Sequence, residues 1–219
     1  DVYKRQVPGS CPANARDLFS EGLHVPPVRL YRKGEINSDV VSFISGNSRS
    51  PIIVLGDLMG QAGVCIQGGY RVKELFARFG KSAVSGSFDS LRSRSLQLIR
   101  EQILKIPDFR DNAVRLMDHD GINLDKPLAI RVDVEKKGAN VTFDFSETDH
   151  QGVGPINIRP HLLNAACAYV MVAITDPSLP INQGVLDSFQ TVTKKGTVVD
   201  PEFPAPVNSY NTALHSIIE

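Results

Sequence analysis

The fold class is decided by the stretch LAIRVDVEKKGANVTFDF, residues 128–145. In its first half apolar residues alternate with charged ones, and Gly138 interrupts this pattern before a second alternation begins. A period of two places successive side chains on opposite faces of a strand, so each half predicts a half-buried strand and the glycine predicts the turn. This stretch predicts an antiparallel β-hairpin, to which residues Phe109 to Met117 add a third strand. Residues Phe189 to Thr193 and Gly196 to Val199 predict two further short strands around a turn at Lys194-Lys195-Gly196.

The regions on either side of the hairpin have helical patterns. Apolar residues recur at helical spacing from Pro51 to Phe79, which predicts a long helix. A second amphipathic helix is expected from Phe88 to Lys105, and residues Pro160 to Thr175 are expected to form a buried helix. The first helix contains several glycines, each of which costs about 1 kcal/mol relative to Ala in a helix interior. It therefore needs close packing or a kink, and we expect the two long helices to pack antiparallel.

The N-terminal part of the chain is rich in proline, glycine and serine. From Val7 to Tyr31 the prolines favour extended or looped backbone, with one helical turn near Ala13 to Phe19. Ser38 offers an N-cap for a short helix that ends near Asn47.

Composition and charge exclude several classes of function. The 219 residues include 24 basic and 24 acidic side chains, so no global field attracts nucleic acid or an anionic membrane. The longest apolar stretch, Leu162 to Thr175, is too short to span a bilayer. Cys11, Cys65 and Cys167 lie far apart in the sequence, which fits neither a disulfide framework nor a zinc motif. We therefore expect a cytoplasmic protein that binds neither nucleic acid nor membrane.

Easily recognised catalytic motifs are absent, among them the Walker loop, the dinucleotide-binding glycine pattern and His-Glu-x-x-His. Asp118-His119-Asp120-Gly121 places potential metal ligands next to one another. With Asn123 close behind, the same residues favour a polar turn that leads into the sheet, and this is our interpretation. Asp149-His150 is interpreted in the same way.

Several polar residues are candidates for binding. Asp57 and Gln61 share one face of the glycine-rich helix, which suits a polar helix contact, a subunit interface or simple exposure to solvent. In Gly154-Pro155-Ile156-Asn157, the asparagine could fix an amide substrate, fix another loop or cap the following helix. Glu21 and Arg29 bracket a double-proline corner and are candidates for an ion pair.

Five motifs in a fixed order carry a resemblance to a known family. They are Pro8-Gly9-Ser10 with the run from Glu21 to Tyr31, Leu55-Gly56-Asp57-Leu58 with Gln61, Asp120-Gly121, Gly154-Pro155-Ile156-Asn157, and Pro204 to Val207. In this order they resemble the hydantoinase B / oxoprolinase family, over a range from about Val7 to Glu219. The family includes the B subunits of hydantoinases, the matching half of 5-oxoprolinases and the alpha subunits of acetone-type carboxylases. Where the family usually has Arg and Gln-Arg after the last motif, this chain has Tyr210 and His215-Ser216.

The resemblance implies ATP-dependent hydrolysis of a cyclic amide, such as hydantoin or 5-oxoproline, or alternatively ATP-dependent carboxylation of a ketone. It implies that a hydantoinase A-type partner subunit handles ATP and that the full-length parent holds a divalent metal ion. The ligands of that ion are expected upstream of Pro8, where this chain has Asp1-Val2-Tyr3-Lys4-Arg5-Gln6 and no match. We therefore assign no metal ligand within the chain. A third possibility is a scaffold or interaction module without catalytic function.

These observations together predict an α+β chain with paired long helices and an antiparallel sheet, a fragment of a larger subunit. Residues 1–6 are expected to be foreign to the natural gene, 7–106 to form a loop-rich and helical region, and 107–219 to form an α+β region. The fragment alone is expected to be inactive and poorly soluble, because truncation would expose apolar surface. Substrate or interface contacts are expected from five residues, while the catalytic residues stay unassigned: Arg29, Asp57, Gln61, Asn157 and Asn208.

Overall fold

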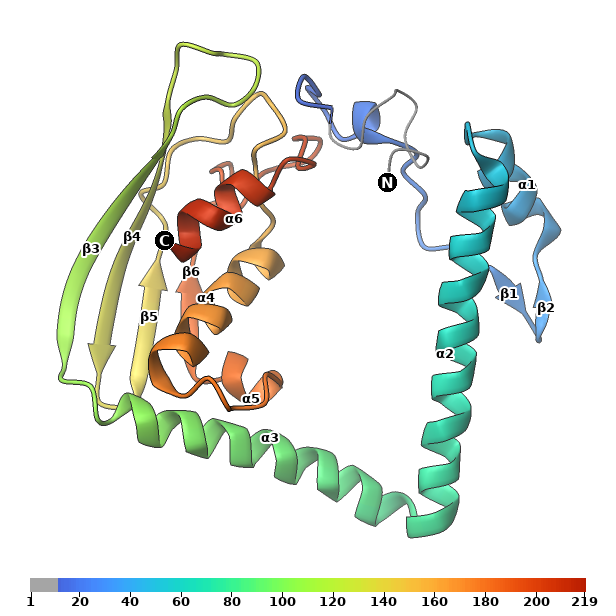
Figure 1. Cartoon of the computed structure of the whole chain (residues 1–219), viewed down its shortest axis with the longest axis horizontal. Helices are drawn as coiled ribbons and strands as arrows, with labels where there is room; N and C mark the ends of the chain where they lie inside the picture. The colour runs from blue at the N-terminus through green and yellow to red at the C-terminus, as the bar shows by residue number, and fades with distance from the viewer. Residues whose placement is uncertain (1–11) are drawn as a thin grey trace.

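The computed structural model describes residues 12–219, so Cys11, the Pro8-Gly9-Ser10 run and the 1–6 segment lie outside the described residues. Figure 1 shows an open arrangement in which a sheet with its helices and a long separate helix stand apart, joined by a further long helix. The elements are η2 (Phe19–Glu21), β1 (Tyr31–Arg32), β2 (Glu35–Ile36), α1 (Ser38–Gly46), α2 (Pro51–Phe79), α3 (Lys81–Ile103), β3 (Phe109–Met117), β4 (Leu128–Lys137), β5 (Asn140–Asp144), α4 (Pro160–Thr175), α5 (Gln183–Leu186), β6 (Phe189–Val192) and α6 (Asn211–Ile218).

The main sheet has the strand order β3-β4-β5-β6. Strands β3, β4 and β5 are antiparallel as predicted, whereas β6 pairs with β5 in parallel. The prediction of a purely antiparallel sheet is therefore wrong at this edge, because the connection through α4 and α5 returns the chain in the same direction as β5. The short strand predicted from Gly196 to Val199 is also absent, since within it only Thr197 makes isolated bridges, to His150 and Asp200.

The hydrophobic core lies between the sheet and the helices α4 and α6, which Figure 1 shows on one side of the strands. The last turns of α3 add Ile99 and Ile103, both fully buried. From α4, Leu163, Cys167 and Met171 face the same core. Burial raises the pKa of the Cys167 thiol to about 12, so this cysteine stays protonated and serves as a small apolar side chain. This core holds the loops at the ends of the strands in place.

The long helices α2 and α3 do not pack antiparallel. Gly80 between them has a φ of +80°, a backbone conformation that glycine adopts readily. Figure 1 shows that the two helices meet at this corner and diverge. No residue of α2 is buried, and Val64 is 73% exposed and Ile52 86% exposed. Because helices that touch only at a corner cannot cover each other's apolar stripe, the predicted pairing is wrong.

Helix α2 is also the one helix within residues 12–219 that is long and apolar enough to cross a membrane by length and composition alone. Such a single helix is weak evidence for a membrane span. Helix α4, which coincides with the apolar stretch considered in the sequence, falls short of the necessary length.

The segment before α2 forms a small lobe beside that helix. Strands β1 and β2 form a hairpin whose turn contains Lys33 and Gly34, both at positive φ. Helix α1 begins at Ser38, but the N-cap is Asn37, whose side-chain oxygen accepts a hydrogen bond from the Asp39 amide at 3.2 Å. The helical turn expected before Phe19 occurs instead as the 3-10 helix η2.

Candidate functional site

Asn157 lies at the centre of a buried polar cluster, here called the Asn157 cluster, that joins two loops. Its Oδ1 accepts a hydrogen bond from the Gly152 amide at 2.8 Å. Its Nδ2 donates to the carbonyl oxygens of Gly152, Gly154 and Pro206 at 3.0, 3.1 and 2.9 Å. The residue has no exposed surface. The predicted helix cap is wrong, since the N-cap of α4 is Arg159, and the alternative that Asn157 fixes another loop is the one observed.

Asp120 is a second buried polar residue and holds the turn beside this cluster. Its Oδ1 accepts from the amides of Ile122 and Asn123 at 2.8 and 2.7 Å. Its Oδ2 accepts from the Val153 amide at 2.9 Å and from Nδ2 of Asn123 at 3.0 Å. Burial by itself would raise the pKa of Asp120, but the hydrogen bonds from Asn123 and Ile122 outweigh it and the pKa lies below its usual value. The polar-turn interpretation of this motif is confirmed.

Glycines allow the turn and the loop to approach each other closely. A Cβ on Gly154 would lie 1.8 Å from the carbonyl oxygen of Asp120, and one on Gly121 would lie 2.4 Å from the carbonyl oxygen of Ala13. Both contacts are with backbone atoms, which cannot move aside as a flexible side chain can. The glycines of the Asp120-Gly121 and Gly154-Pro155-Ile156-Asn157 motifs are therefore required by packing.

The corner from Pro204 to Val207 joins the same region. Oε1 of Glu21 accepts hydrogen bonds from the backbone amides of Val207 and Asn208 at 2.7 and 2.6 Å. The Leu18 amide donates to the carbonyl oxygen of Pro204 at 2.8 Å. The predicted ion pair between Glu21 and Arg29 is wrong, because the η2 turn directs the carboxylate onto this corner.

A pocket of about 260 Å³ opens beside the Asn157 cluster, and we call it the polar pocket. Two of the motifs, the acidic turn and the Gly-Pro loop, meet there with the chain just beyond the proline corner. A fourth segment, at Ala13, closes one wall. The lining residues are Ala13, Asp118, His119, Asp120, Gly121, Pro155, Ile156, Ser209 and Thr212. Segments nearly two hundred positions apart in the sequence, from Ala13 to Thr212, thus form one site.

The five residues predicted to contact substrate or an interface fall into two groups. Asn157 and Asn208 belong to the region beside the polar pocket, Asn157 through its side chain and Asn208 through its amide. Arg29 is exposed before β1, and Asp57 and Gln61 lie on α2, which Figure 1 shows at the far end of the molecule from the sheet. None of these three lines the polar pocket. Contact of any of the five with a substrate stays a prediction.

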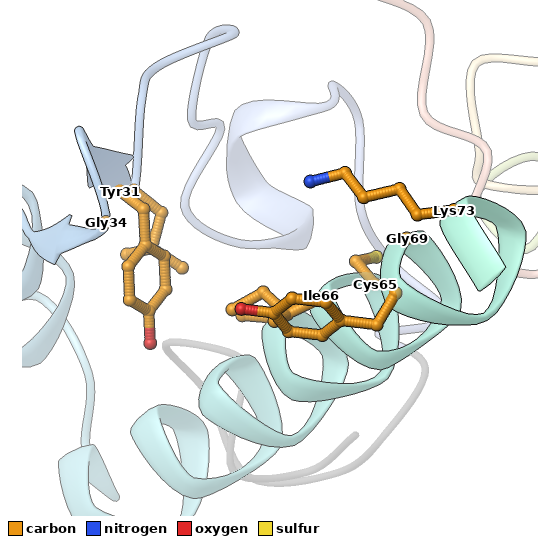
Figure 2. Close-up of a pocket in the computed structure, with 9 residues that line it drawn as sticks. Tyr31, Gly34, Cys65, Ile66, Gly69 and Lys73 are labelled. Carbon is orange, nitrogen blue, oxygen red and sulfur yellow. The ribbon is translucent and has the colours of Figure 1, made fainter. Parts of the chain in front are cut away.

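A second, more apolar pocket of about 570 Å³ lies between the β1–β2 hairpin and α2. Figure 2 shows Tyr31 extending from the hairpin towards α2, with Lys73 on the α2 side of the pocket. The Tyr31 hydroxyl donates to Sδ of Met59 at 3.6 Å. The other walls of this pocket include Leu30, Ala62 and Ile66, so the pocket offers mainly apolar packing surface.

A metal centre does not fit the described part of the chain by itself. Within residues 12–219, no group of three or more His, Cys, Asp or Glu side chains is placed to hold an ion. Asp118 and His119 line the polar pocket, but both carboxylate oxygens of the neighbouring Asp120 already accept hydrogen bonds from backbone amides and from Asn123.

Comparison with known proteins identifies the family. The family model described as hydantoinase B/oxoprolinase matches residues 5–219. The chain belongs to the hydantoinase B/oxoprolinase family. Residues of two of the motifs, the acidic turn and the Gly-Pro loop, line the polar pocket together with the chain that follows the proline corner, and this marks that pocket as the candidate functional site.

Individual relatives show the breadth of the family. A Pseudomonas protein (strain NS671) named as the B component of a D-/L-hydantoinase is 29% identical over 231 residues, covering 97% of this chain and 38% of the relative. The acetophenone carboxylase delta subunit of Aromatoleum aromaticum is 28% identical over 196 residues, covering 89% of this chain and 29% of the relative. The crystal structure of the ATP-dependent caprolactamase from Pseudomonas jessenii superposes with a TM-score of 0.86 at 24% identity, covering 99% of this chain and 37% of that one. The chain thus spans about a third of the length of these relatives.

Sequence reasoning did not select four residues of the polar pocket. Asp118 and His119 were recognised as polar but assigned to the turn alone. Ser209 and Thr212 carry no local signal, because an isolated serine or threonine near the start of a helix is ordinary. Only their position next to the Gly-Pro loop, where the Ser209 amide donates to the Pro155 carbonyl oxygen at 2.8 Å, brings them to the site.

Proposed function

We propose that this chain is part of a hydantoinase B-type subunit that takes part in the ATP-dependent hydrolysis of a cyclic amide, hydantoin- or 5-oxoproline-like. The observation that carries the proposal is the meeting of two of the motifs, the acidic turn and the Gly-Pro loop, at one polar pocket beside the chain that follows the proline corner. Support also comes from relatives named as a hydantoinase subunit and an ATP-dependent caprolactamase, whose name states a reaction at a cyclic amide.

The part of this chain in that reaction is to build one wall of the site. The Asn157 cluster and the Asp120 turn hold the wall rigid, since each buried polar atom has its partners on the backbone or on Asn123. A rigid wall binds a ligand without the entropic cost of ordering it first. Hydrolysis of an amide requires that its carbonyl oxygen be polarised, and donors at the pocket are suited to that task.

ATP and metal belong to other parts of the assembly in this proposal. A hydantoinase A-type partner subunit handles ATP, and residues outside this chain hold a divalent metal ion in the full-length parent. The same proposal places the protein in the cytoplasm. Without these parts the chain alone has no activity.

An alternative is the subunit of an ATP-dependent acetone-type carboxylase. The similarity to the acetophenone carboxylase delta subunit supports it. A ketone, like an amide, presents a carbonyl oxygen to the pocket, but it lacks the N–H group. A non-catalytic scaffold is the third possibility.

One experiment separates the three. The full-length subunit that contains this chain is purified with its A-type partner and incubated with ATP and hydantoin, 5-oxoproline or caprolactam, while ring opening and ADP are measured. Ring opening that depends on ATP supports the proposal. Incorporation of labelled bicarbonate into a ketone without ring opening identifies a carboxylase. If the complex shows neither activity and holds no divalent ion, the subunit is a scaffold. The partner subunit alone is the control.

A further inference from the structure

The polar groups around the polar pocket are of two kinds: some have hydrogen-bond partners within the described residues, and others have none there. Asp120 is satisfied by four hydrogen bonds from the turn and the loop, and Asn157 behind the pocket is satisfied as well. In contrast, the structure gives no hydrogen-bond or ion-pair partner within residues 12–219 for the Asp118 carboxylate or for Nε2 of His119. Both residues line the pocket.

The tautomer of His119 follows from its one hydrogen bond. The Gly121 amide donates to Nδ1 of His119 at 3.1 Å. An Nδ1 that accepts a hydrogen bond carries no proton, so in the neutral ring the proton is on Nε2. His119 therefore carries its donor at Nε2, and the same pocket is lined by Asp118, whose carboxylate is an acceptor.

A donor and an acceptor from consecutive residues of one pocket match the needs of one edge of a cyclic amide. An open-chain secondary amide is trans, so that its carbonyl oxygen and its N–H point to opposite edges. A small ring forces the amide to be cis, which places the carbonyl oxygen and the N–H on the same edge. That edge can accept from one neighbouring group and donate to another at the same time.

We propose that Asp118 and His119 form a subsite of the polar pocket that binds the cis-amide edge of a ring, with Nε2–H of His119 donating to the carbonyl oxygen and the Asp118 carboxylate accepting from the N–H. This inference rests on the proposed function and specifies how the ring is selected. Ser209 and Thr212 line the same pocket.

The subsite is held in place by the fold around it. The Gly121 amide that fixes His119 belongs to the turn anchored by Asp120, and Gly121 has a φ of +89° and contacts Ala13 closely. Ser209 on the opposite wall is anchored by its amide to the carbonyl oxygen of Pro155 at 2.8 Å. Because His119 and the Ser209 backbone are already held in place, only the Asp118 side chain has to be ordered when a ligand binds.

Two substitutions at one position test the role of His119. In His119→Asn, the side-chain oxygen replaces Nδ1 as acceptor for the Gly121 amide, and the Nε2 donor is lost. In His119→Gln, the terminal amide replaces Nε2 as donor, and the acceptor for Gly121 is lost. Loss of one hydrogen bond to a ligand corresponds to about a tenfold weaker affinity.

Binding is measured by calorimetry on the full-length subunit with its partner and without ATP, using caprolactam, N-methylcaprolactam and N-methylacetamide. We expect caprolactam to bind about tenfold more weakly to His119→Asn than to the unchanged protein. The affinity of His119→Gln for caprolactam should stay within about threefold of that of the unchanged protein, while its melting temperature falls because the acceptor for Gly121 is lost. We expect N-methylcaprolactam, which has no N–H, and the open-chain N-methylacetamide to bind the unchanged protein at least about tenfold more weakly than caprolactam.

Two results would overturn the inference. One is equal affinity of caprolactam for the unchanged protein and for His119→Asn. The other is loss of bound divalent ion in His119→Asn, because His119 would then hold a metal and not the amide. Since binding is measured without turnover, its outcome is separate from ring opening. If the unchanged complex opens the ring but His119→Asn binds caprolactam with unaltered affinity, only this inference is wrong. If the unchanged complex does not open the ring, the result counts against the proposed function.

Discussion

The side-chain amide of Asn157 donates a hydrogen bond of 2.9 Å to the carbonyl oxygen of Pro206, which lies 49 residues further along the chain. Through this bond the Gly-Pro loop and the proline corner form one rigid unit. Ser209 and Thr212 of the polar pocket follow directly after that corner. The shape of the pocket therefore depends on a residue that does not line it.

Replacement of Asn157 by Asp tests this dependence. The carboxylate has no N–H to donate to the carbonyl oxygens of Gly152, Gly154 and Pro206, and it would be a buried charge among acceptors. We expect a loss of about 3 kcal/mol or more in the free energy of unfolding, measured by urea denaturation. The exposed Asn140, replaced in the same way, is the control, with an expected change within about 0.5 kcal/mol. Equal effects at the two positions would contradict the role of Asn157.

A glycine substitution tests the close approach of the loop to the Asp120 turn. In Gly154→Ala the new Cβ would lie 1.8 Å from the carbonyl oxygen of Asp120, so the loop must move or the chain must unfold. We expect a loss of at least about 2 kcal/mol in the free energy of unfolding. In Gly86→Ala the Cβ meets no atom within 4 Å on the surface of α3, and a gain of up to about 1 kcal/mol is expected. A Gly154→Ala variant as stable as the unchanged chain would refute the packing argument.

Asp120 makes stability depend on acid pH. Its pKa is lowered in the folded chain, because hydrogen bonds to the charged form outweigh the effect of burial. The unfolded chain therefore binds a proton at higher pH than the folded one does. The stabilisation from Asp120 is complete above the unfolded pKa, near 3.8, and is lost as the pH falls through the lower, folded pKa.

The measurement is urea denaturation between neutral pH and pH about 3. We expect Asp120→Asn to be less stable than the unchanged chain at pH 7 and to lose less stability on acidification. Asp111→Asn on the exposed strand β3 is the control and should leave the acid dependence in place. An acid dependence of Asp120→Asn equal to that of the unchanged chain would show that Asp120 is not responsible.

The exposed apolar face of α2 predicts that the 219-residue chain associates with itself. Ile52 and Val64 are 86% and 73% exposed, and exposed apolar patches of this kind drive association. The double variant Ile52→Glu and Val64→Glu should reduce the apparent mass in light scattering. A monodisperse monomer of the unchanged chain at high concentration would be incompatible with this prediction.

The local elements could be predicted from the sequence alone, because each depends on neighbouring residues. Helices α2 and α4 have the predicted bounds, since proline starts each of them and Gly80 or Asp176-Pro177 stops it. The β4–β5 hairpin follows from alternation around Gly138. The family could also be recognised in this way, since motif order is a property of the sequence.

The tertiary structure alone decided how these elements meet. The angle at Gly80 follows from its backbone conformation, and the parallel addition of β6 follows from the path through α4 and α5. The use of Asn157 as a link to Pro206 and the meeting of His119 with Ser209 at one pocket depend on contacts between distant segments. Periodicity predicts which face of an element is buried, but it does not predict which other element packs on that face. The packing partner depends on contacts between distant segments, which form only when the whole chain folds.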